Sequence, residues 1–263
     1  MSDPIAKPAA GGAIYPSLRD RVVFITGGAS GIGAAIVEQF CAQGAKVSFV
    51  DIDADGAKAL ASSIADRDLP RPNFFPCDLK DIDALQSVIA QVIATDGPIT
   101  SLINNAANDE RHAIDDVTPE YFDDRIAVNL RHQFFATQAV HGPMGEAGGG
   151  SIVNIGSVTW MIGQGGMPCY SASKAAIAGM TRSLARDLGP KNIRVNSVLP
   201  GWIMTKRQVD NWLTPEGEAE LMSRQCLKRP LQPEELAKVV LFFAADDSGI
   251  CTNQNYIADG GWV

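Results

Sequence analysis

The sequence predicts an α/β fold, a doubly wound parallel sheet of seven strands with helices on both faces, in a single domain. Short apolar runs alternate with helical patterns from residue 22 onward, and a glycine-rich turn joins the first run to the first helix. Strands separated by helices imply parallel pairing with right-handed crossovers. With 263 residues, 46% hydrophobic and 20% charged, and with no internal repeat, the chain can fill one core.

Seven apolar runs of strand length account for the sheet. In order, they are residues 21–26, 46–52, 73–79, 101–107, 151–157, 193–201 and 254–261. Helical spacing fills the intervals between them, and Gly44 closes the first helix. The expected helices lie near residues 31–44, 54–66, 81–94, 118–141, 170–188 and 233–245.

Two segments fall outside this alternation. Residues 1–17, which contain many Pro, Ala and Gly residues, are expected to form a flexible arm, so the domain should span residues 18–263. The segment near 201–224 contains Trp, Pro and Gly but no clean strand. It is expected to form a mobile lid of short helices that excludes water from a bound substrate.

Composition argues against several classes of function. A net charge of −8 and a pI near 4.9 disfavour binding to nucleic acid or anionic membranes, which requires a basic patch. No apolar run of about 18 residues and no basic leader occurs, so neither a membrane span nor a signal peptide is expected. Five cysteines without a C-x-x-C pair fit a reducing cytoplasm, and three histidines without an H-E-x-x-H pattern disfavour a metal site. The expected partner is a small molecule.

The glycine-rich turn "TGGASGIG", residues 26–33, lies where a strand ends and a helix begins. Glycines there let the backbone approach a pyrophosphate, which rests on the amide donors of the helix N-terminus. Asp51 follows Gly31 by twenty residues, at the end of the second strand, where it can accept hydrogen bonds from adenosine ribose hydroxyls. Because a carboxylate repels a 2′-phosphate, NAD is expected rather than NADP. A solvated carboxylate at a strand end is the alternative for Asp51.

A tyrosine and a lysine lie four residues apart in "PCYSASKAA", residues 168–176. On a helix Tyr170 and Lys174 share a face, so the phenol and the ammonium would lie one turn apart. Taken alone, such a pair is more often an aromatic ring packed beside a lysine stem. The remaining segments must distinguish the two interpretations.

Five motifs in register favour the functional interpretation. "TGGASGIG", "NNAA" at 104–107, Asn129, Ser157 and the Tyr170–Lys174 pair, in this order, resemble the short-chain dehydrogenase/reductase family over about residues 18–261. The resemblance implies a Rossmann-type fold, a nicotinamide cofactor, and a homotetramer in which the helices near 118–141 and 170–188 pack between subunits. Ala107 departs from the family, which more often has Gly there. The implied cofactor contacts are Gly27, Ser30, Gly31, Ile32, Gly33, Asp51, Ile52, Asp78, Leu79, Asn105, Ala106, Ala107, Tyr170, Lys174, Pro200, Gly201, Ile203 and Thr205.

The resemblance also implies a catalytic group of Ser157, Tyr170, Lys174 and Asn129. Oxidising an alcohol requires a base, yet a free tyrosine has a pKa of about 10. A neighbouring cation lowers that pKa, so Tyr170 is expected to be the base, and Lys174, together with the positive nicotinamide, to tune it. Lys174 would also bind the nicotinamide ribose, Ser157 the substrate oxygen, and Asn129 a water chain that carries the proton to solvent.

Further strings resemble those of bacterial sugar dehydrogenases in the family, which oxidise aldopyranoses such as xylose, arabinose or galactose at C1 to the lactone. They include "NDERH" at 108–112, "VNLRH" at 128–132, "TKRQ" at 205–208 and the "DGGW" ending. A buried sugar needs many polar partners, because an unpaired buried polar group is costly. The expected substrate residues are Ser157 and Tyr170, with Asn108, Asn154, Gln164 and Arg207 as polar contacts and Trp202 or Trp160 as a stacking ring.

Alternatives remain for these residues and for the reaction. The loop from Asp109 to His112 can be solvated with internal salt bridges, Asn154 can satisfy backbone groups at a strand end, and the tryptophans can belong to the core. A polyol, secondary-alcohol or sugar-acid dehydrogenase would use the same catalytic group. A non-catalytic NAD-binding sensor is a further alternative, although such a protein has no reason to keep all four catalytic residues.

Overall fold

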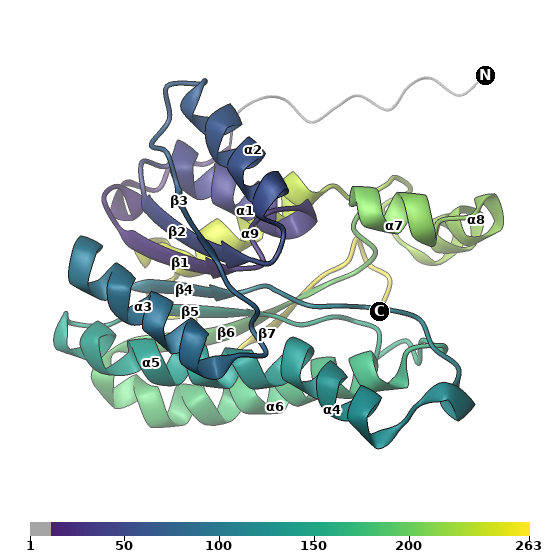
Figure 1. Ribbon diagram of the computed structural model, residues 1–263. Helices are drawn as coiled ribbons and strands as arrows, with labels where there is room; N and C mark the ends of the chain where they lie inside the picture. The colour runs from purple at the N-terminus through teal and green to yellow at the C-terminus, as the bar shows by residue number, and fades with distance from the viewer. Residues whose placement is uncertain (1–11) are drawn as a thin grey trace.

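Seven parallel strands form one sheet in the order β3-β2-β1-β4-β5-β6-β7 in the computed structural model, which describes residues 12–263 (Figure 1). The predicted fold class is confirmed. The central strands are apolar and buried, as expected for a sheet covered on both faces. The strands are β1 (Val22–Thr26), β2 (Lys46–Asp51), β3 (Asn73–Pro76), β4 (Ser101–Asn104), β5 (Gly150–Ile155), β6 (Ile193–Pro200) and β7 (Asn255–Ala258).

Helices cover the two faces of the sheet in two groups (Figure 1). On one face lie α1 (Gly31–Ala42), α2 (Ala54–Ala65) and α9 (Pro233–Ala244), and on the other α3 (Ile82–Asp96), α4 (Pro119–Ile126), α5 (His132–Glu146) and α6 (Pro168–Leu188). Each group buries its own apolar core against the sheet. No helix within residues 12–263 is long and apolar enough to cross a membrane.

Local sequence explains where several helices begin. The carboxylates of Asp53 and Asp81 accept hydrogen bonds from the amides of Gly56 and Ala84, which caps α2 and α3. Threonine hydroxyls cap the two short helices that follow β6, α7 (Lys206–Asn211) and α8 (Pro215–Arg224). These two helices occupy the predicted lid segment and project beyond one end of the sheet (Figure 1).

The predicted helix near 118–141 is not one regular helix. It consists of α4, a π-helical turn at Ala127–Arg131, and α5, which continues to Glu146 past Pro143. A π turn inserts one residue into the helical repeat and often accompanies a functional site. Here the turn contains Asn129, one of the predicted catalytic residues.

The ends of some elements also differ from the predictions. β3 and β4 stop at Pro76 and Asn104, three residues earlier than expected, because the residues after them leave the sheet to line a cavity. Most of the arm predicted over residues 1–17 lies outside the described residues. Its last part is attached to the domain: Pro16–Leu18 forms a short 3₁₀ helix, and the Leu18 side chain is fully buried.

Candidate active site

A cavity of about 1010 Å³ opens at the carboxyl ends of β1, β4, β5 and β6. β1 lies between β2 and β4, so the chain changes direction across the sheet at this point. Open α/β sheets bind ligands at such a switch point, because loops that diverge from neighbouring strands leave a crevice. Every residue predicted to contact a cofactor lines this cavity.

The glycine-rich turn has a shape that only glycine allows at two positions. Gly27 has φ +70°, and a Cβ there would lie 2.7 Å from Cα of Ala106. A Cβ at Gly33 would lie 1.8 Å from the carbonyl oxygen of Gly27. The backbone of the turn therefore lies close to the start of α1, and no Cβ at Gly27 or Gly33 obstructs it. This geometry lets a pyrophosphate approach the backbone amides.

Side chains from neighbouring strands hold this turn in place. Asn105 Nδ2 donates to the carbonyl oxygens of Thr26 and Gly27 at 3.1 and 2.9 Å, and the Thr26 hydroxyl accepts from the amide of Asn105 at 3.0 Å. Asp51 acts from the other side, accepting from the amides of Ala29 at 2.9 Å and Asp53 at 3.0 Å. The end of β2 is thus joined to the turn, with the Asp51 carboxylate at the cavity wall.

Ser157, Tyr170 and Lys174 line one part of the same cavity. Tyr170 and Lys174 lie on α6, and Ser157 follows β5. Lys174 is only 1% exposed; its Nζ donates to the carbonyl oxygen of Ile155 at 2.7 Å and lies 5.5 Å from the centroid of the Tyr170 ring. The i, i+4 spacing therefore brings the ammonium over the phenol ring, as the sequence predicted.

Burial dominates the ionisation of this pair. Burial raises the pKa of Tyr170 and the charge of Asp109 raises it further, whereas Ser157 and Arg111 act to lower it. Burial lowers the pKa of Lys174 to about 7, against the opposing effect of Asp109. Among the protein's own residues, desolvation outweighs the nearby charges, so the pKa of the phenol lies above its usual value. The expected lowering of this pKa by Lys174 together with a positive nicotinamide stays a prediction.

Asn129 lies behind the cavity rather than in its wall. It is fully buried in the π turn, and its side chain forms a pair of hydrogen bonds with the backbone of Asn108. The amide of Asn108 donates to Asn129 Oδ1 at 2.8 Å, and Asn129 Nδ2 donates to the carbonyl oxygen of Asn108 at 3.1 Å. Asn129 therefore fixes the start of the loop that follows β4.

The predicted substrate residues divide into two groups. Asn108, Gln164, Trp202 and Arg207 line the cavity together with Ser157 and Tyr170. Asn154 does not, and its prediction as a substrate contact is wrong. Its side chain is fully buried within the sheet, where Oδ1 accepts from Asn104 Nδ2 at 2.8 Å and Nδ2 donates to the Thr181 hydroxyl at 3.0 Å. Trp160, the other candidate stacking ring, is also absent from the cavity wall.

Comparison with known proteins places these features in a family. The family model described as enoyl-(acyl carrier protein) reductase matches residues 27–263. D-xylose 1-dehydrogenase of Caulobacter vibrioides is 48% identical over 250 residues, which cover 95% of this chain and 98% of that protein. The probable galactose dehydrogenase GalD of Rhizobium meliloti is 48% identical over 247 residues, 94% of this chain and 96% of that one. The chain belongs to the short-chain dehydrogenase/reductase family.

A solved structure agrees with this assignment. The 3-oxoacyl-(acyl-carrier protein) reductase from Brucella melitensis aligns with a TM-score of 0.88 at 32% identity, covering 95% of this chain and 94% of that one. As a short-chain dehydrogenase/reductase the protein is an oxidoreductase, and dehydrogenases of the family use nicotinamide cofactors. The glycine turn, the Asp51 carboxylate and the Tyr170–Lys174 pair fit such a dinucleotide. Residues 12–263 contain no cluster of His, Cys, Asp or Glu that could hold a metal ion.

Sequence reasoning missed several residues of this short-chain dehydrogenase/reductase site. Asp109 and Arg111 line the cavity instead of forming a merely solvated loop, and Gln208 reaches it from α7. Trp262 also lines it, because the C-terminal segment returns beneath the lid: the amides of Cys226 and Leu227 donate to the carbonyl oxygens of Gly261 and Gly260. The "NDERH" string was a usable signal for the loop, and the "DGGW" ending, which the resemblance to sugar dehydrogenases included, contains the C-terminal tryptophan.

Proposed function

We propose that the protein is an NAD-dependent sugar dehydrogenase that oxidises the C1 hydroxyl of an aldopyranose to the aldonolactone. The observation that carries the dehydrogenase part is the convergence of Ser157, Tyr170 and Lys174 on the cavity that the glycine-rich turn also lines. The sugar part is supported by the names of the two relatives that match nearly the whole chain. Asn108, Gln164 and Arg207 give the cavity the polar wall that a polyhydroxylated ring requires.

The residues of the chain have separate tasks in this reaction. A bound oxidised nicotinamide would supply the hydride acceptor and a positive charge that favours the phenolate. Ser157 hydrogen-bonds the substrate hydroxyl and orients it, and Tyr170 takes the hydroxyl proton. Lys174, fixed by the Ile155 carbonyl, keeps a cationic donor beside the phenol and binds the nicotinamide ribose. Asn129 holds the loop that carries Asn108 and Asp109 in the cavity wall.

Replacing Tyr170 tests the proposed base. Tyr170→Phe keeps the ring that packs under Lys174 but removes the phenol oxygen, which is the proposed proton acceptor. We expect turnover of xylose, arabinose or galactose to fall by about 10²–10⁴-fold, while NADH still binds. Steady-state NADH absorbance and NADH fluorescence titration measure the two quantities. Retained turnover in Tyr170→Phe would remove the phenol from the mechanism.

A substrate panel separates this function from its alternatives. Wild-type protein is assayed with aldoses, polyols, secondary alcohols and sugar acids under the same conditions. Activity confined to aldoses supports the proposal, and activity confined to polyols points to the related alternative. Complete inactivity, with NAD binding retained, would instead support a non-catalytic sensor.

Cofactor choice depends on Asp51. Its carboxylate lies at the end of β2 on the cavity wall and would repel a 2′-phosphate. Asp51→Ala is expected to raise KM for NAD by roughly tenfold and to narrow the NAD to NADP ratio of kcat/KM. The same change removes the hydrogen bonds to the amides of Ala29 and Asp53, so thermal unfolding of Asp51→Ala checks that the variant keeps its fold. An unchanged cofactor preference would mean that another residue contacts the ribose.

A further inference from the structure

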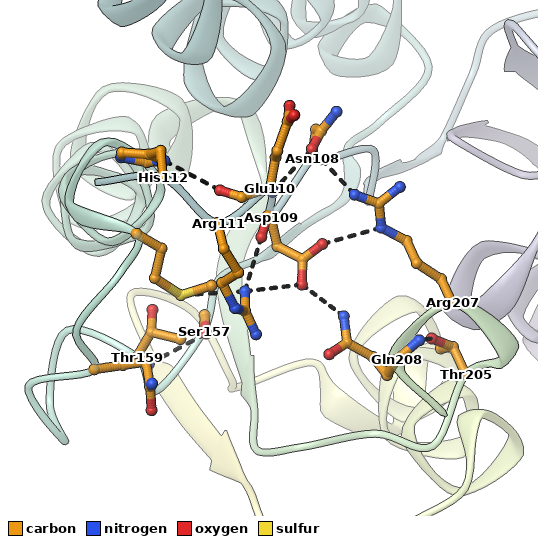
Figure 2. Close-up of polar contacts among 12 residues, drawn as sticks. Asn108, Asp109, Glu110, Arg111, His112, Ser157, Thr159, Thr205, Arg207 and Gln208 are labelled. Carbon is orange, nitrogen blue, oxygen red and sulfur yellow. Dashed lines mark hydrogen bonds and ion pairs between the residues drawn. The ribbon is translucent and has the colours of Figure 1, made fainter. Parts of the chain in front are cut away.

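The short helix α7 is attached to the loop after β4 by one carboxylate (Figure 2). Asp109 Oδ1 accepts from Arg207 Nε at 3.2 Å, and Oδ2 accepts from Gln208 Nε2 at 2.5 Å. Arg207 and Gln208 are on α7, almost a hundred residues away in the sequence from Asp109. Asn108 adds a bond, since its Oδ1 accepts from Arg207 Nη2 at 3.3 Å. The loop and the helix thus face each other across the mouth of the cavity.

Arg111 adds a second link between the loop and α7, because it contacts both Asp109 and Trp212. Its Nη1 donates to the carbonyl oxygen of Asp109 at 2.7 Å and to Oδ2 at 3.3 Å, and its guanidinium lies 5.0 Å from the centre of the Trp212 ring at the end of α7. Three donor groups therefore converge on the Asp109 carboxylate, whose side chain is 17% exposed. An ion pair this sheltered is screened less than an ordinary surface pair.

The same carboxylate acts on the catalytic pair. The charge of Asp109 raises the pKa of Tyr170 and also raises that of Lys174. The other groups that affect Tyr170 are Ser157, which follows β5, and Arg111, and Lys174 lies over its ring. At its start the loop is fixed to Asn129 through Asn108, so Asp109 is held at a defined place relative to α6.

We propose that Asp109 is a positioning residue that joins the lid helix α7 to the acid–base centre. Its carboxylate holds α7 at the cavity through Arg207 and Gln208, and Asp109 lines the same cavity as Tyr170 and Lys174. The kinetic part rests on the proposed function, whereas the attachment of α7 does not. Arg207, predicted to bind the substrate, has its guanidinium engaged by Asn108 and Asp109.

Three variants separate the two effects of Asp109. Asp109→Asn removes the negative charge and turns an amide NH₂ toward the donors of Arg207 or Gln208. It should therefore weaken the attachment of α7 and also remove the charge that acts on Tyr170 and Lys174. Arg207→Gln weakens the attachment but leaves the Asp109 charge in place. Glu110→Gln removes a neighbouring charge from a side chain that is 54% exposed and pairs with Arg125 instead, and it is the matched control.

Hydrogen exchange of the amides of residues 206–212, in protein without dinucleotide or sugar, measures the attachment. We expect faster exchange in Asp109→Asn and Arg207→Gln and wild-type exchange in Glu110→Gln. KM for the sugar should rise by about three- to tenfold in the first two variants. The pH–kcat profile should move to lower pH only in Asp109→Asn, because loss of a negative charge lowers the pKa of both Tyr170 and Lys174.

The outcomes are distinct. Wild-type exchange in both Asp109→Asn and Arg207→Gln would overturn the attachment, whether or not the protein oxidises sugars. An acid shift of the same size in Arg207→Gln as in Asp109→Asn, or none in either, would overturn the link to Tyr170. If wild-type protein fails to oxidise any sugar, the proposed function fails while the exchange result still decides the attachment. Arg207 is half-exposed, so its replacement keeps the test valid if Asp109→Asn does not fold.

Discussion

Desolvation is the largest influence on the pKa of both Tyr170 and Lys174 in the candidate active site. Tyr170 and Lys174 are both displaced toward their neutral forms, the phenol with a raised pKa and the amine with a pKa of about 7. A cation beside a tyrosine is therefore insufficient to describe this pair, because burial acts on both partners at once. We therefore expect a positively charged bound nicotinamide, together with Lys174, to favour the phenolate.

His132 is a third buried base, one turn from Asn129. It is fully buried, and the backbone of Ala127 and Val128 in the π turn lies beside its ring. Burial, followed by the charge of Lys174, lowers the pKa of His132 to about 3, against the opposing effect of hydrogen bonds to that backbone. Between about pH 6.5 and about pH 3 the unfolded chain thus binds a proton that the folded protein excludes.

This difference makes the stability depend on pH. Above about pH 6.5, His132 does not lower the free energy of unfolding. Below that pH the free energy of unfolding should fall by up to about 1.4 kcal/mol per pH unit because of this one site. Urea unfolding at several pH values measures the slope. His132→Gln should flatten it, whereas His112→Gln, which also removes one imidazole, should keep it. Equal slopes in all three proteins would contradict the assignment to His132.

The π turn between α4 and α5 has a clear consequence for the site. It places Asn129 where both polar atoms of its side chain meet the backbone of Asn108. Apolar periodicity predicted one helix here and did not reveal the inserted residue, which rotates the residues after it by about 100° around the helix axis. The segment around Asn129 is joined to the loop after β4 by these two hydrogen bonds.

The same helices lead us to expect a homotetramer. Phe122 on α4 and Phe134 on α5 are each 43% exposed, an apolar surface that a subunit contact would cover. Phe134→Glu is expected to shift the protein to dimers or monomers in sedimentation equilibrium. Lys58→Glu adds a glutamate to α2, on the opposite face of the sheet, and should leave the assembly intact. A monomeric wild-type protein would refute the expectation.

The sheet connects the two parts of the cavity, the glycine-rich turn and the group of Ser157, Tyr170 and Lys174. The glycine-rich turn, Asp51 and Asn105, which are predicted to contact the dinucleotide, lie at the ends of β1, β2 and β4. The predicted catalytic residues Ser157 and Tyr170 come from the end of β5 and from α6. Two separate apolar cores hold the helices on either side, so the crevice lies at the edge common to both. The helices α7 and α8 follow β6, and α7 is hydrogen-bonded to the loop after β4.

The alternation of apolar runs and helical segments was enough to predict the seven strands, and the resemblance to the short-chain dehydrogenase/reductase family added the roles expected of the glycine-rich turn, Ser157, Tyr170 and Lys174. These features depend on contacts between residues close in sequence, or on the fixed geometry of a parallel sheet. The burial of Asn154, the return of Trp262 and the pairing of Asp109 with Arg207 were decided by tertiary packing. Each brings together groups far apart along the chain, and their polar atoms find partners only after the sheet and the loops have assembled.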